Sequence, residues 1–80
     1  MKADIVLDVK GKTCPMPVLL TRKKIKTLEP EKILEIIGDF PPGKKNIENF
    51  LNTNGYEILE VFEEEEFIIY LQKYRFGNYF

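Results

Sequence analysis

Residues 3–28 read ADIVLDVKGKTCPMPVLLTRKKIKTL, and the period of the apolar pattern changes within this stretch. In residues 3–9 apolar and polar side chains alternate, which is typical of a strand with one buried face. In residues 15–28 the core-facing positions recur at helical spacing, and they are Val18, Thr21, Ile25 and Leu28. The stretch therefore predicts a strand, a loop over residues 10–13, and a helix.

The segment that follows predicts a second strand and a loop. Glu29-Pro30 is expected to end the first helix, because a residue that precedes proline disfavours helical backbone. Residues 33–37 are mostly apolar and predict a short strand. Residues 38–43, Gly-Asp-Phe-Pro-Pro-Gly, have the composition of a loop.

The C-terminal half predicts a helix followed by a hairpin. The helix is expected over residues 44–54, with Gly55 as its stop. Its apolar face consists of Ile47, Phe50 and Leu51. Residues 56–62 and 67–74 predict two antiparallel strands joined through Glu63–Glu66. The element order β-α-β-α-β-β predicts an α/β (α+β) two-layer sandwich, in which two helices cover one face of a four-stranded mixed sheet.

The composition restricts the possible classes of function. The 80 residues are enough for one domain, 1–80, and 44% hydrophobic with 31% charged residues is typical of a soluble globular protein. No apolar run approaches the length of a membrane span, and the strand-like start leaves no room for a signal peptide. With one cysteine and no histidine, a Cys–His dyad, a Cys/His zinc site and an internal disulfide are excluded, so we expect a cytoplasmic protein.

The single cysteine lies at the predicted junction of strand and helix, in Cys14-Pro15-Met16-Pro17. Pro15 suits the first helical position, and the two prolines fix the backbone on both sides of Met16. A helix N-terminus carries partial positive charge and free N–H groups, so those of Met16 and Val18 could face a thiolate. We predict a reactive thiol at the helix N-cap. The alternative is a small buried side chain, because position 14 points along the helix with the core residues.

Other residues near this turn have two possible roles each. Arg22 and Lys23, about two turns along the helix, either attract a partner or form an ordinary solvated face. Asp8 either tunes the thiol or, as we favour, ends the pairing of its strand or caps a nearby turn. Gly11 is expected to serve the backbone geometry near the cysteine, through a positive φ or through a close approach of the backbone. Asp39 is expected to be a loop and helix-start element, with a partner contact as the second possibility.

A wider set of spaced residues extends this motif: Leu7, Asp8, Gly11, Cys14, Pro15, Pro17, Val18, Arg22 and Lys23. The pattern resembles the opening signature of the TusA/SirA sulfur-carrier family. Residues 36–41, followed by Ile47 and Phe50, are similar to the second segment of that family. The resemblance covers nearly the whole chain and implies the same β-α-β-α-β-β fold. Four residues depart from the family pattern: Phe40 and Asn46 stand where aspartates are usual, Glu48 replaces a proline, and Leu51 lies where some members have a second cysteine.

The resemblance implies a sulfurtransferase-like carrier in a sulfur relay. Cys14 would accept sulfane sulfur from a donor protein such as a cysteine desulfurase, hold it as a persulfide, and pass it to an acceptor protein. Pro15 and Pro17 would present the thiol, and the basic helix face would dock the partner. We expect no cofactor, no metal and no membrane partner. The pathway stays open among tRNA thiolation, molybdenum cofactor, selenium handling and sulfur oxidation.

The alternative function is a non-catalytic regulatory or binding module, whose basic helix would contact RNA or protein. The net charge of −1 and the lack of aromatic residues among the basic ones argue against direct binding of nucleic acid.

The run Glu63–Glu66 is expected to be a solvated turn rather than a calcium loop. The aromatic tail, residues 74–80, either packs on the uncovered face of the sheet or contacts a partner.

Overall fold

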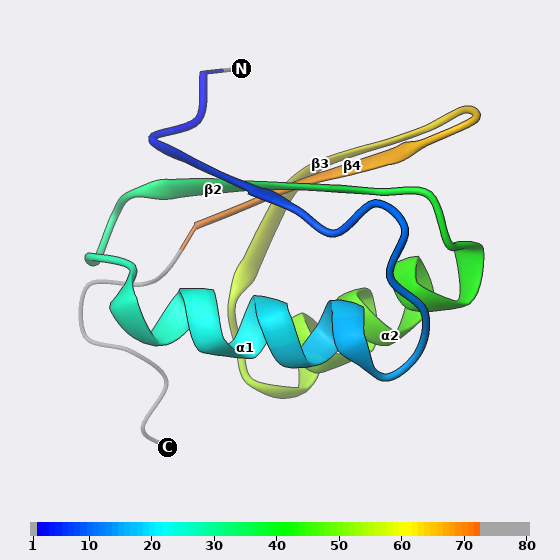
Figure 1. The fold of residues 1–80 in the computed structure, drawn as a ribbon. Helices are drawn as coiled ribbons and strands as arrows, with labels where there is room; N and C mark the ends of the chain where they lie inside the picture. The colour runs from blue at the N-terminus through cyan, green and yellow to red at the C-terminus, as the bar shows by residue number, and fades with distance from the viewer. Residues whose placement is uncertain (1, 73–80) are drawn as a thin grey trace.

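The computed structural model describes residues 2–72. Two helices and four strands follow one another in the predicted order β-α-β-α-β-β (Figure 1). The elements are β1 (Ile5–Asp8), α1 (Met16–Thr27), β2 (Ile33–Gly38), α2 (Pro41–Thr53), β3 (Glu57–Glu63) and β4 (Phe67–Gln72). The predicted fold class is therefore confirmed.

The strands form one mixed sheet in the order β1-β2-β4-β3. β1 and β2 are parallel and are connected through α1, whereas β4 pairs antiparallel with both β2 and β3. Figure 1 shows α1 and α2 side by side beneath the same face of the sheet. Because α1 and α2 each follow one of the two parallel strands β1 and β2, the N-termini of the helices lie at the same end of the molecule, beside the loop that follows β1.

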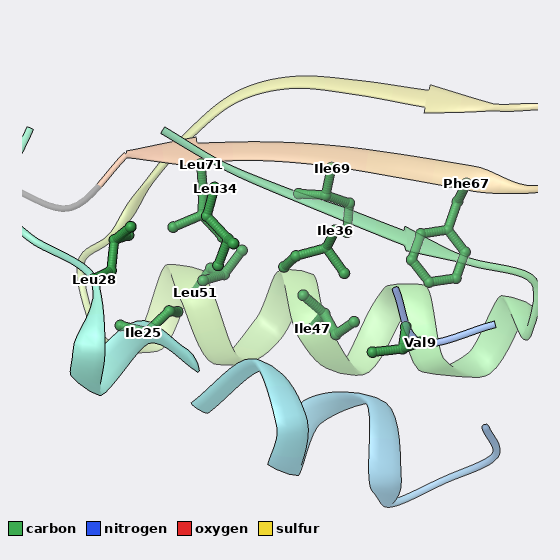
Figure 2. Packing of buried hydrophobic residues seen from close by; sticks show 10 residues of the cluster. All are labelled: Val9, Ile25, Leu28, Leu34, Ile36, Ile47, Leu51, Phe67, Ile69 and Leu71. Carbon is green, nitrogen blue, oxygen red and sulfur yellow. The ribbon is translucent and has the colours of Figure 1, made fainter. Parts of the chain in front are cut away.

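The core lies between the sheet and the helices, and ten buried apolar side chains form it (Figure 2). Leu34 and Ile36 from β2 and Ile69 from β4 are completely buried against Ile47 and its neighbours on α2. The expected core faces of the helices are thus confirmed: Ile25 and Leu28 lie inside with Leu51. Removing such a side chain to alanine costs about 2–5 kcal/mol, so this layer dominates the stability of the fold.

The start of α2 differs from the sequence prediction. The helix begins at Pro41 rather than near Lys44, so the prediction of a loop through Gly43 was wrong for its last residues. Proline is well suited to the first helical turn, where its missing N–H has no helical acceptor. The C-terminus agrees with the prediction: Gly55 has φ +77°, and the N–H of Tyr56 donates to the carbonyl of Leu51 at 2.9 Å, as in a Schellman motif.

The hairpin turn is shorter than predicted, because β3 continues through Glu63. Glu63 pairs with Phe67 at the end of the hairpin, and its carboxylate lies 3.5 Å from Nζ of Lys44 on α2. The remaining glutamates form the turn, and Glu66 lies 3.6 Å from Nζ of Lys10. Within residues 2–72 no group of three or more acidic or cysteine side chains could hold a metal ion, and no helix is long and apolar enough to cross a membrane. The aromatic tail lies outside the described residues.

The face of the sheet away from the helices is partly apolar. A bulge between Ile58 and Glu60 shifts the register of β3, so Glu60 and Phe62 pair with Tyr70 and Ile68 on this face. The rings of Phe62 and Tyr70 pack edge to face at 6.1 Å. Partial burial raises the pKa of Tyr70, and a hydrogen bond with Glu35 together with the nearby carboxylates raises it further.

Candidate functional site: the Cys14 turn

Cys14 lies in a tight turn immediately before α1 and not at the helix cap. The N-cap is Pro15, and the helix begins at Met16, one position later than the sequence predicted. The N–H of Met16 donates to the carbonyl of Thr13 at 2.8 Å, which closes the turn. The expectation that this N–H faces the sulfur was therefore wrong, because its hydrogen bond is already made within the backbone.

The thiol of Cys14 is exposed to solvent, so the alternative of a small buried core residue is wrong. Cys14 belongs to the turn closed between Thr13 and Met16, and not to α1, so its side chain does not continue the buried face of the helix. Pro17 is the buried member of the motif, while Pro15 is exposed. The two prolines thus differ: Pro17 anchors the start of α1 in the protein, and Pro15 lies at the surface beside the sulfur.

The loop between β1 and Cys14 is fixed by side-chain oxygens. Asp8 Oδ1 accepts the N–H of Lys10 at 2.8 Å, which supports the turn-capping interpretation of Asp8. Gly11 has φ +80°, as predicted. Asp39 Oδ1 accepts the N–H of Gly11 at 3.0 Å, across the gap between this loop and the start of α2. Asp39 was expected to help start a helix, but Phe40 is the N-cap of α2 and Asp39 binds the cysteine loop instead.

The N-terminal turn of α2 packs closely against the N-terminal turn of α1. A methyl group at position 43 would lie 3.1 Å from Cγ of Pro17, so Gly43 allows the two turns to approach. Asn46 lies one turn further along the same face of α2. Its amide Nδ2 donates a hydrogen bond to Sγ of Cys14 at 3.3 Å.

Asn46 is the residue of this site that the sequence did not identify. Its only signal in the sequence was a departure from the family pattern, which indicates nothing about distance. The contact spans 32 positions in the chain and depends on the packing of Pro17 against Gly43. Asn46 directly precedes Ile47 and lies four positions before Phe50, at the edge of the predicted apolar face, and this periodicity could have marked it as a residue close to the first helix.

The exposed side of α1, the helix that follows the Cys14 turn, combines apolar and basic groups. Met16 and Leu19 on α1 are exposed large apolar side chains, with relative exposures of 41% and 46%. Arg22 and Lys23 follow on the same helix and are exposed. Thr21 of the same helix is buried, and its hydroxyl donates to the carbonyl of Pro17 at 2.8 Å. An exposed thiol, a side-chain N–H donor and an adjacent mixed surface suit nucleophilic sulfur chemistry with a protein partner.

Comparison with known proteins agrees with this geometry. The family model of the sulfurtransferase TusA matches residues 5–73, which include both helices and all four strands. The chain belongs to the TusA family. Sulfur relay is the function of the family, so the resemblance predicted from the sequence is confirmed at that level.

Individual members of the TusA family match over most of the chain. A candidate sulfur carrier protein of Methanocaldococcus jannaschii is 41% identical over 68 residues, which are 84% of this chain and 91% of the relative. The sulfur carrier protein TusA of Pseudomonas aeruginosa is 33% identical over 67 residues, 84% of this chain and 85% of that protein.

A solved structure supports the fold independently. The crystal structure of the SirA-like protein from Desulfitobacterium hafniense superposes with a TM-score of 0.77 at 22% sequence identity. The superposition covers 88% of this chain and 97% of the solved chain. The two proteins therefore share the two-layer arrangement of two helices on a four-stranded sheet. The superposition shows the fold alone, and the site is described from the residues of this chain.

Proposed function

We propose that Cys14 is the sulfur-carrying residue and that it holds sulfane sulfur as a persulfide. The Cys14 thiolate attacks the outer sulfur of a donor persulfide, the donor S–S bond breaks, and its electron pair leaves with the donor thiolate. The transferred sulfur is then bonded to Sγ, and the number of S–S bonds and the oxidation state are conserved. Attack by an acceptor thiolate reverses the process and releases Cys14. The observation that carries the proposal is the exposure of the chain's single thiol beside a donor N–H.

The proposal includes docking of the partners on the exposed stripe of α1. Met16 and Leu19 are exposed near the start of α1, within five positions of Cys14 along the chain, and the exposed Arg22 and Lys23 follow on the same helix. An apolar patch with a basic rim suits a partner that presents apolar side chains ringed by carboxylates. A donor protein such as a cysteine desulfurase and a downstream acceptor protein would use this surface in turn.

The proposed relay operates in the cytoplasm, where an exposed lone thiol stays reduced. Thiolation of tRNA is one pathway that such a relay would supply, with the final chemistry performed by the acceptor. The proposal requires no membrane partner and no direct contact with nucleic acid. It concerns a carrier with sulfurtransferase chemistry, and it assigns no cofactor to the chain.

Intact-mass spectrometry after incubation with a low-molecular-weight persulfide tests the assignment of Cys14. We expect a gain of one sulfur on the native chain, complete loss of the gain on treatment with a reductant, and no gain on Cys14→Ser. A circular dichroism spectrum of the variant that matches the native one shows that folding is intact. An unmodified native chain after two chemically different donors, with the thiol still open to alkylation, would contradict the proposal.

Charge reversal tests the docking surface separately. Arg22→Glu together with Lys23→Glu should slow sulfur transfer from a desulfurase by about tenfold at low salt, and the difference should shrink as salt rises. Loading by the small persulfide should stay unchanged, because it needs no docking. Lys32→Glu, at an exposed lysine in the turn before β2, is the control for each single variant, Arg22→Glu and Lys23→Glu, because each of the three changes the net charge by the same amount. Equal slowing by the control and by the single variants would place the docking surface elsewhere.

A further inference from the structure

We infer that Asn46 acts directly in the sulfur transfer, by donating its amide N–H to Sγ of Cys14 whenever that sulfur carries negative charge. The inference rests on the proposed persulfide function and adds a second residue to it. Its basis is the contact of 3.3 Å between Nδ2 of Asn46 and Sγ of Cys14. The two residues come from different elements, α2 and the turn before α1, so the packing of the fold creates the contact.

The surroundings fix the position of Asn46. It lies on the inner side of α2, one turn after Gly43 and next to the fully buried Ile47. Its side chain is half-buried, whereas the sulfur it contacts is exposed. The amide is therefore held by a rigid helix while the thiol stays accessible to a partner. Such an arrangement presents a donor at a fixed place without closing the site.

The hydrogen bond is stronger when Sγ of Cys14 is a thiolate than when Sγ is the inner sulfur of a persulfide. A thiolate sulfur is a stronger acceptor than a neutral thiol or the inner sulfur of a persulfide, because it carries the full charge. When an acceptor attacks the outer sulfur, the S–S bond breaks and its electron pair moves to Sγ. The amide of Asn46 then stabilises the charge that develops on Sγ, so Cys14 becomes a better leaving group.

The hydrogen bond acts differently on loading and on handover. In loading, Cys14 is the attacking group, and a hydrogen bond to its sulfur lowers the nucleophilicity of that sulfur. In handover, Cys14 is the leaving group, and the same hydrogen bond speeds its departure. We therefore expect loss of the amide to slow release of the sulfur more than its uptake. A residue with a merely structural role would slow both steps alike.

Cyanolysis of the loaded protein measures the release step without any partner protein. Cyanide attacks the outer sulfur, the S–S bond breaks, thiocyanate forms, and Cys14 is left as the thiolate. We expect Asn46→Ala to slow thiocyanate release about three- to tenfold, which corresponds to the loss of one hydrogen bond to a charged acceptor at an exposed site. Asn46→Asp keeps the shape but places a carboxylate near the sulfur, and it should slow release further.

Matched variants make the result specific. Asn49→Ala removes an exposed asparagine three positions further along the same helix, and this variant should release sulfur at the native rate. Asp39→Ala loosens the cysteine loop without touching the sulfur, so it should not reproduce the split between release and uptake. Asn46→Gln, which retains an amide, should release sulfur faster than Asn46→Ala. Circular dichroism and thermal unfolding check that every variant remains folded.

The outcomes separate this inference from the function on which it rests. If the native chain takes up no sulfur from either donor, the persulfide function fails. The contact is then still tested, because alkylation of the free thiol by iodoacetamide at neutral pH should be slower in Asn46→Asp than in native protein. If the native chain loads and the Asn46 variants release sulfur at the native rate, the role of Asn46 is overturned while the function of Cys14 stands.

Discussion

The two helices begin in similar sequence but have different roles in the site. Both α1 and α2 have proline in the first turn, and neither has a side-chain cap or an acidic residue there. The start of α1 holds an exposed thiol in the turn before it, whereas the start of α2 buries Gly43 against Pro17. The comparison shows that one helix start presents the reactive group and the other fixes the surroundings of that group.

The two starts are also held in place by different interactions. The turn before α1 is stabilised by hydrogen bonds: the Thr13 carbonyl accepts the N–H of Met16 within the turn, and the Asp39 carboxylate accepts the N–H of Gly11 in the preceding loop. The start of α2 is stabilised by close packing of a helix that is otherwise anchored in the core by Ile47 and Leu51. Hydrogen bonds at an exposed loop contribute about 1 kcal/mol each, and core packing contributes more, so the two starts should respond differently to substitution.

Gly43→Val should have the largest effect, because a branched side chain cannot fit against Cγ of Pro17, which would lie 3.1 Å from the new Cβ. We expect a loss of about 1–3 kcal/mol in the free energy of unfolding, measured by urea denaturation. The separation of the helices should also slow sulfur release, because Asn46 moves away from Cys14. Asn49→Val places the same side chain on the exposed side of α2 and is the control. Equal losses in both variants would mean that helix propensity, and not packing, sets the effect.

Gly11→Ala should have an intermediate effect, through the backbone alone. The residue has φ +80°, and no atom lies within 4 Å of the position that a Cβ would occupy. The expected cost is about 1 kcal/mol in the free energy of unfolding. Gly11→Asn should cost less, because asparagine tolerates a positive φ. An alanine variant as stable as the native chain would show that the loop can reach the cysteine turn with ordinary backbone angles.

Asp39→Ala should have the smallest effect on stability, about 0.5–1 kcal/mol, because the hydrogen bond to Gly11 is exposed. The sharper measurement is hydrogen exchange of the Gly11 amide, which should become faster in Asp39→Ala. Asp39→Asn retains the accepting oxygen and should restore slow exchange. Exchange in Asp39→Ala as slow as in the native chain would remove Asp39 from the interactions that hold the loop.

Much of the fold was predictable because it depends on local periodicity. The alternation in residues 3–9 and the helical spacing of Ile25 and Leu28 predict the elements that the structure contains. The order of the elements, with a hairpin at the end, predicts the mixed sheet. The errors concern boundaries: Pro41 and Pro42 were assigned to a loop, although proline is also common in the first turn of a helix. Composition alone does not distinguish these two settings.

By itself, the sequence determined the element order, the buried faces, the family and the identity of the only thiol, because these follow from spacing and residue type along the chain. Tertiary structure alone decided that Cys14 precedes the helix cap and is exposed, and that Asp39 binds Gly11. It also decided the contact between Asn46 and Sγ of Cys14. These features depend on how closely α1 and α2 approach, and that distance is set by contacts between residues far apart in the chain.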